Sequence, residues 1–183
     1  MQRLVRSAGV LVAAAVRKAT RRRAPLALAG SRGCKNVFIY SVSKAVGTGI
    51  PERGDRVKML LLRHAGGLFG PPGGEVEPGE HHWHAAKRES REETGYEFRG
   101  GYKELLKFDN GRSRIYLHAV RTLDAPGRPG PLRKGREIEL LQHFSLPELR
   151  LILRGAHPRA PLRAAGHETL VRVVEELRAC GFK

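Results

Sequence analysis

The strongest constraint in this sequence is a loop rich in glycine and proline that runs directly into an acidic segment. Residues 66–80 hold six glycines and three prolines, a composition typical of turns. Residues 82–94 hold neither, and Gly95 follows them, so we expect a helix over 82–94 that ends at this glycine. The chain must therefore fold so that a tight loop leads straight into the first turn of one helix.

Three carboxylates share one face of that expected helix. Glu89, Glu92 and Glu93 are spaced i, i+3 and i+4, which brings neighbouring side chains within about 5–6 Å. Like charges at this spacing destabilise an isolated helix by about 0.2–0.5 kcal/mol per pair, so some positive charge must offset them. Either Arg88 and Arg91 form ion pairs on a solvated face, or a hard divalent cation such as Mg²⁺ binds the oxygens.

The stretch from Gly74 to Tyr96 resembles the Nudix box, written Gly-x5-Glu-x7-Arg-Glu-U-x-Glu-Glu-x-Gly-U with U an apolar residue. All seven fixed residues are present at the required spacing: Gly74, Glu80, Arg88, Glu89, Glu92, Glu93 and Gly95. Two positions depart from the pattern, because Ser90 is polar and Tyr96 is larger than the usual aliphatic residue. Neither departure removes a charged residue of the box.

The resemblance implies the family's fold, an α/β/α sandwich built on a mixed β-sheet, and its chemistry, the hydrolysis of a diphosphate linkage. It implies Mg²⁺ or Mn²⁺ as cofactor, held by the carboxylates of Glu89, Glu92 and Glu93 and by the backbone carbonyl of Gly74. Such a cation neutralises phosphate charge and lowers the pKa of water. We therefore expect a metal-dependent pyrophosphohydrolase.

The resemblance also assigns the remaining roles. Arg88 and Glu80 are implied to be the pair that orients the carboxylates and fixes the loop. Glu92 or Glu89 is the implied general base, a carboxylate that takes the proton as water attacks phosphorus. Glu137 and Glu139 are alternatives, because the family sometimes takes its base from outside the box.

Other segments predict the rest of a single domain over 36–183. Apolar and β-branched runs predict strands over 36–43 and 56–63, and 102–108 and 114–122 flank an Asp-Asn-Gly hairpin signal. Residues 146–153 predict a short helix, and residues 167–179 have the apolar spacing of an amphipathic helix. No stretch approaches the roughly 20 apolar residues of a membrane-spanning helix, which excludes an integral membrane protein.

Net charge is the unusual feature of the composition, and it is unevenly spread. The chain carries +16, but residues 1–35 hold nine basic residues and no acid, which leaves +7 on residues 36–183. Residues 1–35 resemble a mitochondrial transit peptide, which is Arg-rich and acid-poor, so we expect a mitochondrial protein. A secretory signal, a basic arm for RNA or anionic lipid, and a tail without function are the alternatives, with secretion or a cytoplasmic location accordingly.

Several further residues suggest binding roles. Arg128, Arg133, Lys134 and Arg136 either clamp additional substrate phosphates or form solvated surface. The histidines at 81, 82 and 84 fit a polar first helical turn better than a zinc site. Trp83, the only tryptophan, is expected to pack against the fold rather than stack on a base.

The substrate stays open at this level. The first candidate is a highly anionic small molecule. It would be a dinucleoside polyphosphate, an inositol pyrophosphate or another nucleoside diphosphate-linked compound. The 5′ end of RNA, as substrate of a pyrophosphohydrolase or decapping enzyme, and a damaged nucleoside triphosphate are alternatives. A faint similarity to the diphosphoinositol polyphosphate subgroup is seen in Phe108-Asp109-Asn110 and in Arg133–Phe144 followed by His157-Pro158. A non-catalytic Nudix-fold component of a ribonucleoprotein is the alternative from a different class, but such a protein is expected to have lost carboxylates.

Overall fold

The computed structural model describes residues 33–98, 101–123, 138–157, 161–162 and 166–183. The expected targeting segment therefore lies outside the described residues except for its last three positions. The four basic residues expected to clamp phosphates also lie outside them, namely Arg128, Arg133, Lys134 and Arg136. The roles of both segments, and the boundary between the leader and the domain, stay predictions.

Strand β1 (Asn36–Lys44) is the centre of the sheet. It pairs in parallel with β6 (Ser113–Val120) along seven registered positions, from Asn36 opposite Ser113 to Val42 opposite Ala119. On its other edge it pairs antiparallel with β2 (Val57–His64) and with the short β4 (Gly73–Glu75). One parallel pair among antiparallel ones makes the sheet mixed.

The outer strands extend this centre in both directions. β5 (Tyr102–Asp109) pairs antiparallel with β6, while β3 (Phe69–Gly70) and β7 (Ile138–Ser145) both pair antiparallel with β2. The main path of the sheet runs β3-β2-β1-β6-β5. The short β4 therefore lies beside the central strand, immediately before the acidic helix.

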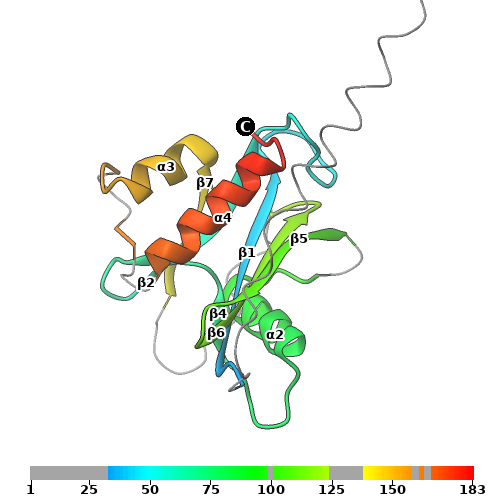
Figure 1. Cartoon of the computed structure of the whole chain (residues 1–183), viewed down its shortest axis with the longest axis vertical. Coiled ribbons are helices and arrows are strands. Elements are labelled where there is room, and N and C mark those ends of the chain that lie inside the picture. The colour runs from blue at the N-terminus through cyan, green and yellow to red at the C-terminus, as the bar shows by residue number, and fades with distance from the viewer. Residues whose placement is uncertain (1–32, 99–100, 124–137, 158–160, 163–165) are drawn as a thin grey trace, which may run out of the picture. The chain divides into compact units, whose positions relative to one another are not determined.

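The alternation of side chains along β1 supplies both faces of the sheet with core residues. Val37 and Ile39 pack toward α2 (His82–Thr94), whereas Tyr40 and Val42 join the larger cluster under the other helices. Those helices are α3 (Leu146–Leu153) and α4 (His167–Ala179), which lie on the opposite side of the strands from α2 (Figure 1). The predicted α/β/α sandwich with a mixed sheet is confirmed.

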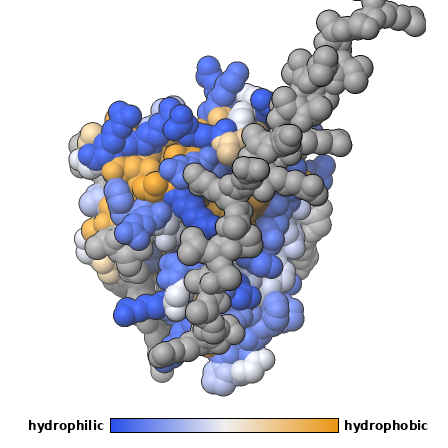
Figure 2. Space-filling view, in the orientation of Figure 1, coloured by the Kyte–Doolittle hydropathy of each residue, from blue (hydrophilic) through white to orange (hydrophobic). Residues whose placement is uncertain are grey.

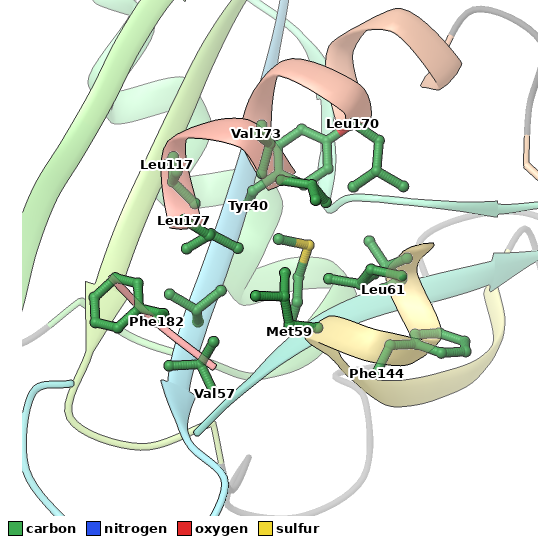
Figure 3. Packing of buried hydrophobic residues seen from close by; sticks show 14 of the residues in the cluster. Tyr40, Val57, Met59, Leu61, Leu117, Phe144, Leu170, Val173, Leu177 and Phe182 are labelled. Atoms are coloured by element: carbon green, nitrogen blue, oxygen red, sulfur yellow. The ribbon is translucent and has the colours of Figure 1, made fainter. Parts of the chain in front are cut away.

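The larger core lies between the sheet and α4. Leu170, Val173 and Leu177 point from α4 onto Tyr40 and Met59 (Figure 3), and all five side chains are at most 2% exposed. The helix face at i, i+3 and i+7 is thus fully covered, as its apolar spacing predicts. In the orientation of Figure 1, Figure 2 shows hydrophobic residues gathered on the side of α3 among otherwise hydrophilic side chains.

The three predicted helices have the bounds that the sequence indicates, and the four predicted strands differ by one or two residues at their ends. Three strands are not among those that the sequence predicts: β3 and β4, which fall inside the expected loop, and β7. Strands of two or three residues exist only because a neighbouring strand pairs with them, so no local pattern indicates them. Within the described residues, no helix combines the length and apolar character needed to cross a membrane.

Candidate functional site

Helix α2 begins and ends at residues that cap it. The ring Nδ1 of His81 accepts a hydrogen bond from the Trp83 backbone N–H at 3.2 Å, which satisfies one donor of the first turn. At the other end, Gly95 adopts a left-handed conformation with φ of 73° and donates its N–H to the Arg91 carbonyl. These two ends fix which residues of α2 face the loop before it.

At two glycines the loop backbone passes very close to its neighbours, at Gly74 to α2 and at Gly73 to β1. A Cβ on Gly74 would lie 2.6 Å from the carboxyl carbon of Glu89, and a Cβ on Gly73 would lie 2.1 Å from the Val37 carbonyl oxygen. Gly73 also has a φ of +154°, which side chains rarely adopt. The Glu89 carboxylate therefore rests directly on the backbone of Gly74.

Arg88 joins the loop to the helix. Its Nε and one terminal nitrogen donate to the two carboxylate oxygens of Glu80 at 3.1 and 2.9 Å, a bidentate pair, and the same nitrogen donates to the Glu75 carbonyl at 3.0 Å. The other terminal nitrogen donates to Glu89 and lies 3.8 Å from Glu92. The hydrogen bonds from Arg88 lower the pKa of Glu80, so its carboxylate stays charged.

Glu89 and Glu93 lie on the side of α2 that faces the loop. Burial raises the pKa of Glu89, and the neighbouring Arg88 counteracts part of that shift. Glu93 accepts a hydrogen bond from the Gly73 N–H at 2.8 Å. Glu92, one turn after Arg88, has a side chain that is 33% exposed. The carboxylates of this face are thus differently placed, and Glu89, whose side chain is 15% exposed, lies deeper than Glu92.

The residues present fit a hard divalent cation. In the part of the chain that the structure describes, no three acidic, histidine or cysteine side chains converge on one point, and Arg88 lies among the carboxylates. The donors around the Gly74–Glu89 contact are nonetheless oxygens, which Mg²⁺ and Mn²⁺ prefer. The glycine keeps open a cradle that any Cβ would fill. Glu89, Glu92, Glu93 and the Gly74 carbonyl are the groups that would hold the ion.

A cavity of about 550 Å³, the smaller of two described here, lies beside the contact between Gly74 and Glu89. Its lining includes Lys35, Glu75, Arg88 and Glu89. The lining thus includes a lysine just before β1 as well as Arg88, so two cationic side chains share this cavity with Glu89. Such a cavity offers an anionic group room next to the box residues.

A larger cavity of about 800 Å³ lies between the sheet and α4. Its lining comes from β1, β2, β3, β5, β6 and α4, and it includes Pro71, two residues before β4. The apolar part of the lining is aromatic and aliphatic: Phe38, Tyr40, Leu61, Phe69, Phe108, Ile115, Leu162 and Leu170. A volume of this size is ordinary for a small-molecule site. The cavity therefore adjoins the loop that leads into the box.

Two other candidates from the sequence take different places. Glu139, an alternative base, pairs with Arg63 of β2 at 2.8 Å, and both side chains are substantially exposed. Glu137 lies outside the described residues. Trp83 packs against Tyr116 and His118 of β6, with ring centres 5.2 and 4.9 Å away, so the prediction that it packs is confirmed.

The chain matches the NUDIX domain over residues 43–165. It belongs to the Nudix family. Nudix hydrolases generally act on phosphoric anhydrides and typically use a divalent metal. A search of curated protein sequences found no significant match to this Nudix protein.

Solved structures with the same fold are distant in sequence. The pyrophosphohydrolase BsRppH of Bacillus subtilis is 22% identical, with 84% of this chain and 87% of that chain covered and a TM-score of 0.54. The protein DR0079 of Deinococcus radiodurans is 18% identical, with coverage of 80% and 88% and a TM-score of 0.53. An Ap4A hydrolase of C. elegans is 19% identical, with coverage of 79% and 99% and a TM-score of 0.48. At such low identity, the similarity to BsRppH and DR0079 shows only that this Nudix protein shares their fold.

Within this Nudix protein, the structure brings together Gly74, Glu80, Arg88 and Glu89 by direct contact, with Glu93 attached through Gly73 and Glu92 at the edge. Sequence reasoning missed most of the larger cavity, because its lining is assembled from six strands and helices. Of its lining, the sequence had pointed to Phe108-Asp109-Asn110 and to the glycine- and proline-rich loop that holds Gly70 and Pro71. Phe38 and Arg172, each taken alone, belong to no sequence pattern that would mark a binding residue.

Proposed function

We propose that this Nudix protein hydrolyses a diphosphate linkage in a nucleoside-containing substrate, a dinucleoside polyphosphate or another nucleoside diphosphate-linked compound, with Mg²⁺ or Mn²⁺. The observation that carries the proposal is the position of the larger cavity. Its lining includes Gly70 and Pro71 of the loop that leads into the box, so a substrate with an uncharged ring at one end and phosphates at the other suits both features.

Each residue of the box has a separate role in this proposal. A bound divalent cation would supply neutralisation of phosphate charge and acidification of water. Glu89 is held by Arg88 and by its contact with Gly74, so its oxygens keep one orientation. Glu93 fixes the loop through the Gly73 N–H. Glu92 or Glu89 takes the proton from the attacking water, and Glu80 keeps Arg88 in place.

The larger cavity favours a nucleoside over an inositol pyrophosphate. Among the described residues that line it, Asp109 and Glu168 balance Arg112 and Arg172, and the remaining lining is largely aromatic and aliphatic. An inositol pyrophosphate carries phosphates all around its ring, so burying it there would cost the desolvation of many charges. A nucleobase is flat and uncharged, and it fills apolar space without that cost.

The test is turnover of a panel that contains dinucleoside polyphosphates, inositol pyrophosphate, nucleotide sugars, oxidised nucleoside triphosphates, and capped and triphosphate RNA. We expect the nucleoside compounds to be cleaved in Mg²⁺ or Mn²⁺. Glu92→Gln and Glu93→Gln should each lower kcat by orders of magnitude with an unchanged melting temperature. Glu97→Gln, which alters a surface carboxylate paired with Arg91, is the matched control and should keep full turnover.

Other outcomes separate the alternatives. Cleavage of RNA ends, with affinity that falls steeply as salt is added, would replace the small molecule with RNA as substrate. No turnover of any compound would favour a non-catalytic role in a ribonucleoprotein. A mitochondrial location remains our proposal for residues 1–35, and it is tested by comparing the location of full-length protein with that of a form beginning at residue 36.

A further inference from the structure

Arg172 of α4 and Phe108 of β5 meet at one wall of the larger cavity. The guanidinium carbon of Arg172 lies 3.8 Å from the centre of the Phe108 ring, so the cation lies over the ring face. Both side chains line the cavity. A planar guanidinium stacks on flat rings, which the compact ammonium group of lysine does not do. The wall is therefore a guanidinium group backed by an aromatic ring, which suits a flat ligand.

The charges around Arg172 argue against a role as a phosphate clamp. Glu168 stands one helical turn earlier on α4 and lines the same cavity, as does Asp109 from β5. Asp109 already accepts two hydrogen bonds from Arg114, at 2.8 and 3.0 Å. Because Arg114 compensates Asp109, the carboxylate that a phosphate beside Arg172 would meet is that of Glu168. An uncharged ring meets no such repulsion.

Polar groups set deep in the cavity complete a site for a heteroaromatic ring. His64, Ser113 and Thr169 line it and are 6%, 5% and 8% exposed. These groups give the otherwise apolar lining a polar side, which a purely aliphatic ligand would not use. The ring nitrogens and exocyclic groups of a base offer partners along its edge, while its faces suit the aromatic lining.

We propose that the Arg172–Phe108 pair determines substrate specificity by providing the stacking wall for the base of the nucleotide. This inference rests on the proposed function only in taking a nucleoside as part of the substrate. Arg172 lines the larger cavity and not the one beside Arg88 and Glu89, so we expect it to set KM and to leave kcat largely unchanged. Purines, which have the larger ring face, gain more from the wall than pyrimidines do.

The experiment measures binding of adenosine, guanosine and cytidine to the full chain by titration in EDTA. These probes carry no phosphate and need neither metal nor catalysis. Arg172→Ala and Arg172→Lys should both weaken purine nucleoside binding, by about five- to thirtyfold, because both remove the planar stacking group. Phe108→Leu should weaken it to a similar degree. Arg178→Ala, at an exposed position near the end of the same helix, is the matched control and should bind as the wild type does.

Kinetics with the best nucleotide substrate provide the second readout. The Arg172 variants should raise KM and leave kcat within about twofold, the pattern of lost binding that is equal in ground and transition states. Wild-type affinity in Arg172→Lys, or no nucleoside binding by the wild type, would overturn the inference. Nucleoside binding that depends on Arg172 in a chain that hydrolyses nothing would uphold the wall and reject the proposed function. Glu92→Gln should bind nucleosides normally while it fails to hydrolyse the substrate.

Discussion

Replacing Gly74 with alanine tests whether the loop must touch the helix for the box to work. The added Cβ would lie 2.6 Å from the Glu89 carboxyl carbon, whereas ordinary contact begins near 3.4 Å. The Glu89 carboxylate must therefore move by about 1 Å. A misplacement of that size typically lowers the rate about a hundredfold, which corresponds to about 2.7 kcal/mol on the barrier.

The same change should leave the fold intact. The atoms that the new Cβ meets belong to the end of a flexible side chain, and Gly74 has no left-handed φ, so alanine suits its backbone. We expect the kcat of Gly74→Ala to fall about a hundredfold, measured as phosphate or nucleotide release, with a melting temperature close to that of the wild type.

Two further glycine variants show whether the loss is specific to this contact. Gly73→Ala places its Cβ 2.1 Å from a backbone oxygen of β1 at a φ of +154°, so it should lower the melting temperature as well as the activity. Gly33→Ala meets no atom within 4 Å and should alter neither. Wild-type turnover in a folded Gly74→Ala protein would refute the idea that the Glu89 position is critical.

Three other perturbations follow from the structure. Arg88→Lys keeps the charge but loses the bidentate pair with Glu80, so kcat should fall about 10–100-fold, and full activity would contradict the bridging role. Leu177→Ala, at a fully buried position, should lower the free energy of unfolding by about 2–5 kcal/mol in urea, whereas Leu151→Ala, 43% exposed, should change it by less than about 0.5 kcal/mol. Burial lowers the pKa of His118 to about 4, so the unfolded chain takes up the proton first as pH falls from 7 to 4. Stability should therefore decrease over that range by up to about 1.4 kcal/mol per pH unit, and a flat melting temperature would show that His118 is not buried uncharged.

The helices were predictable because each has local start and stop signals. α2 is bounded by the proline-containing loop and by Gly95, and α4 carries an apolar stripe that the core covers. β7 was missed because its buried residues, Ile138 and Phe144, lie at its two ends, while the residues between are half-buried or exposed. β7 forms a strand because it pairs with β2, and its own sequence has no alternating apolar pattern that would predict this.

The candidate site likewise has one part that the sequence predicts, the box residues, and one part that it does not, the larger cavity. The box residues lie within 22 positions of one another, so their spacing alone predicts a shared helix face and a loop contact. The closeness of the loop to the helix, with the Glu89 carboxylate against Gly74, emerges only when the loop pairs with β1. The larger cavity takes residues from Phe38 to Arg172, and no short stretch of sequence describes it.

The parallel pairing of β1 with β6 has a consequence for how the chain folds. Val37 is registered with Arg114, and the whole box lies between these two residues in the sequence. The middle of the sheet is thus closed by a contact of high sequence separation, which slows folding because a long loop must be ordered first. β4 pairs with that same strand, at Val37 opposite Gly74. We expect the carboxylate cradle to mature late, in one cooperative event with the sheet, so that nascent chains ending before β6 carry the motif without a working centre.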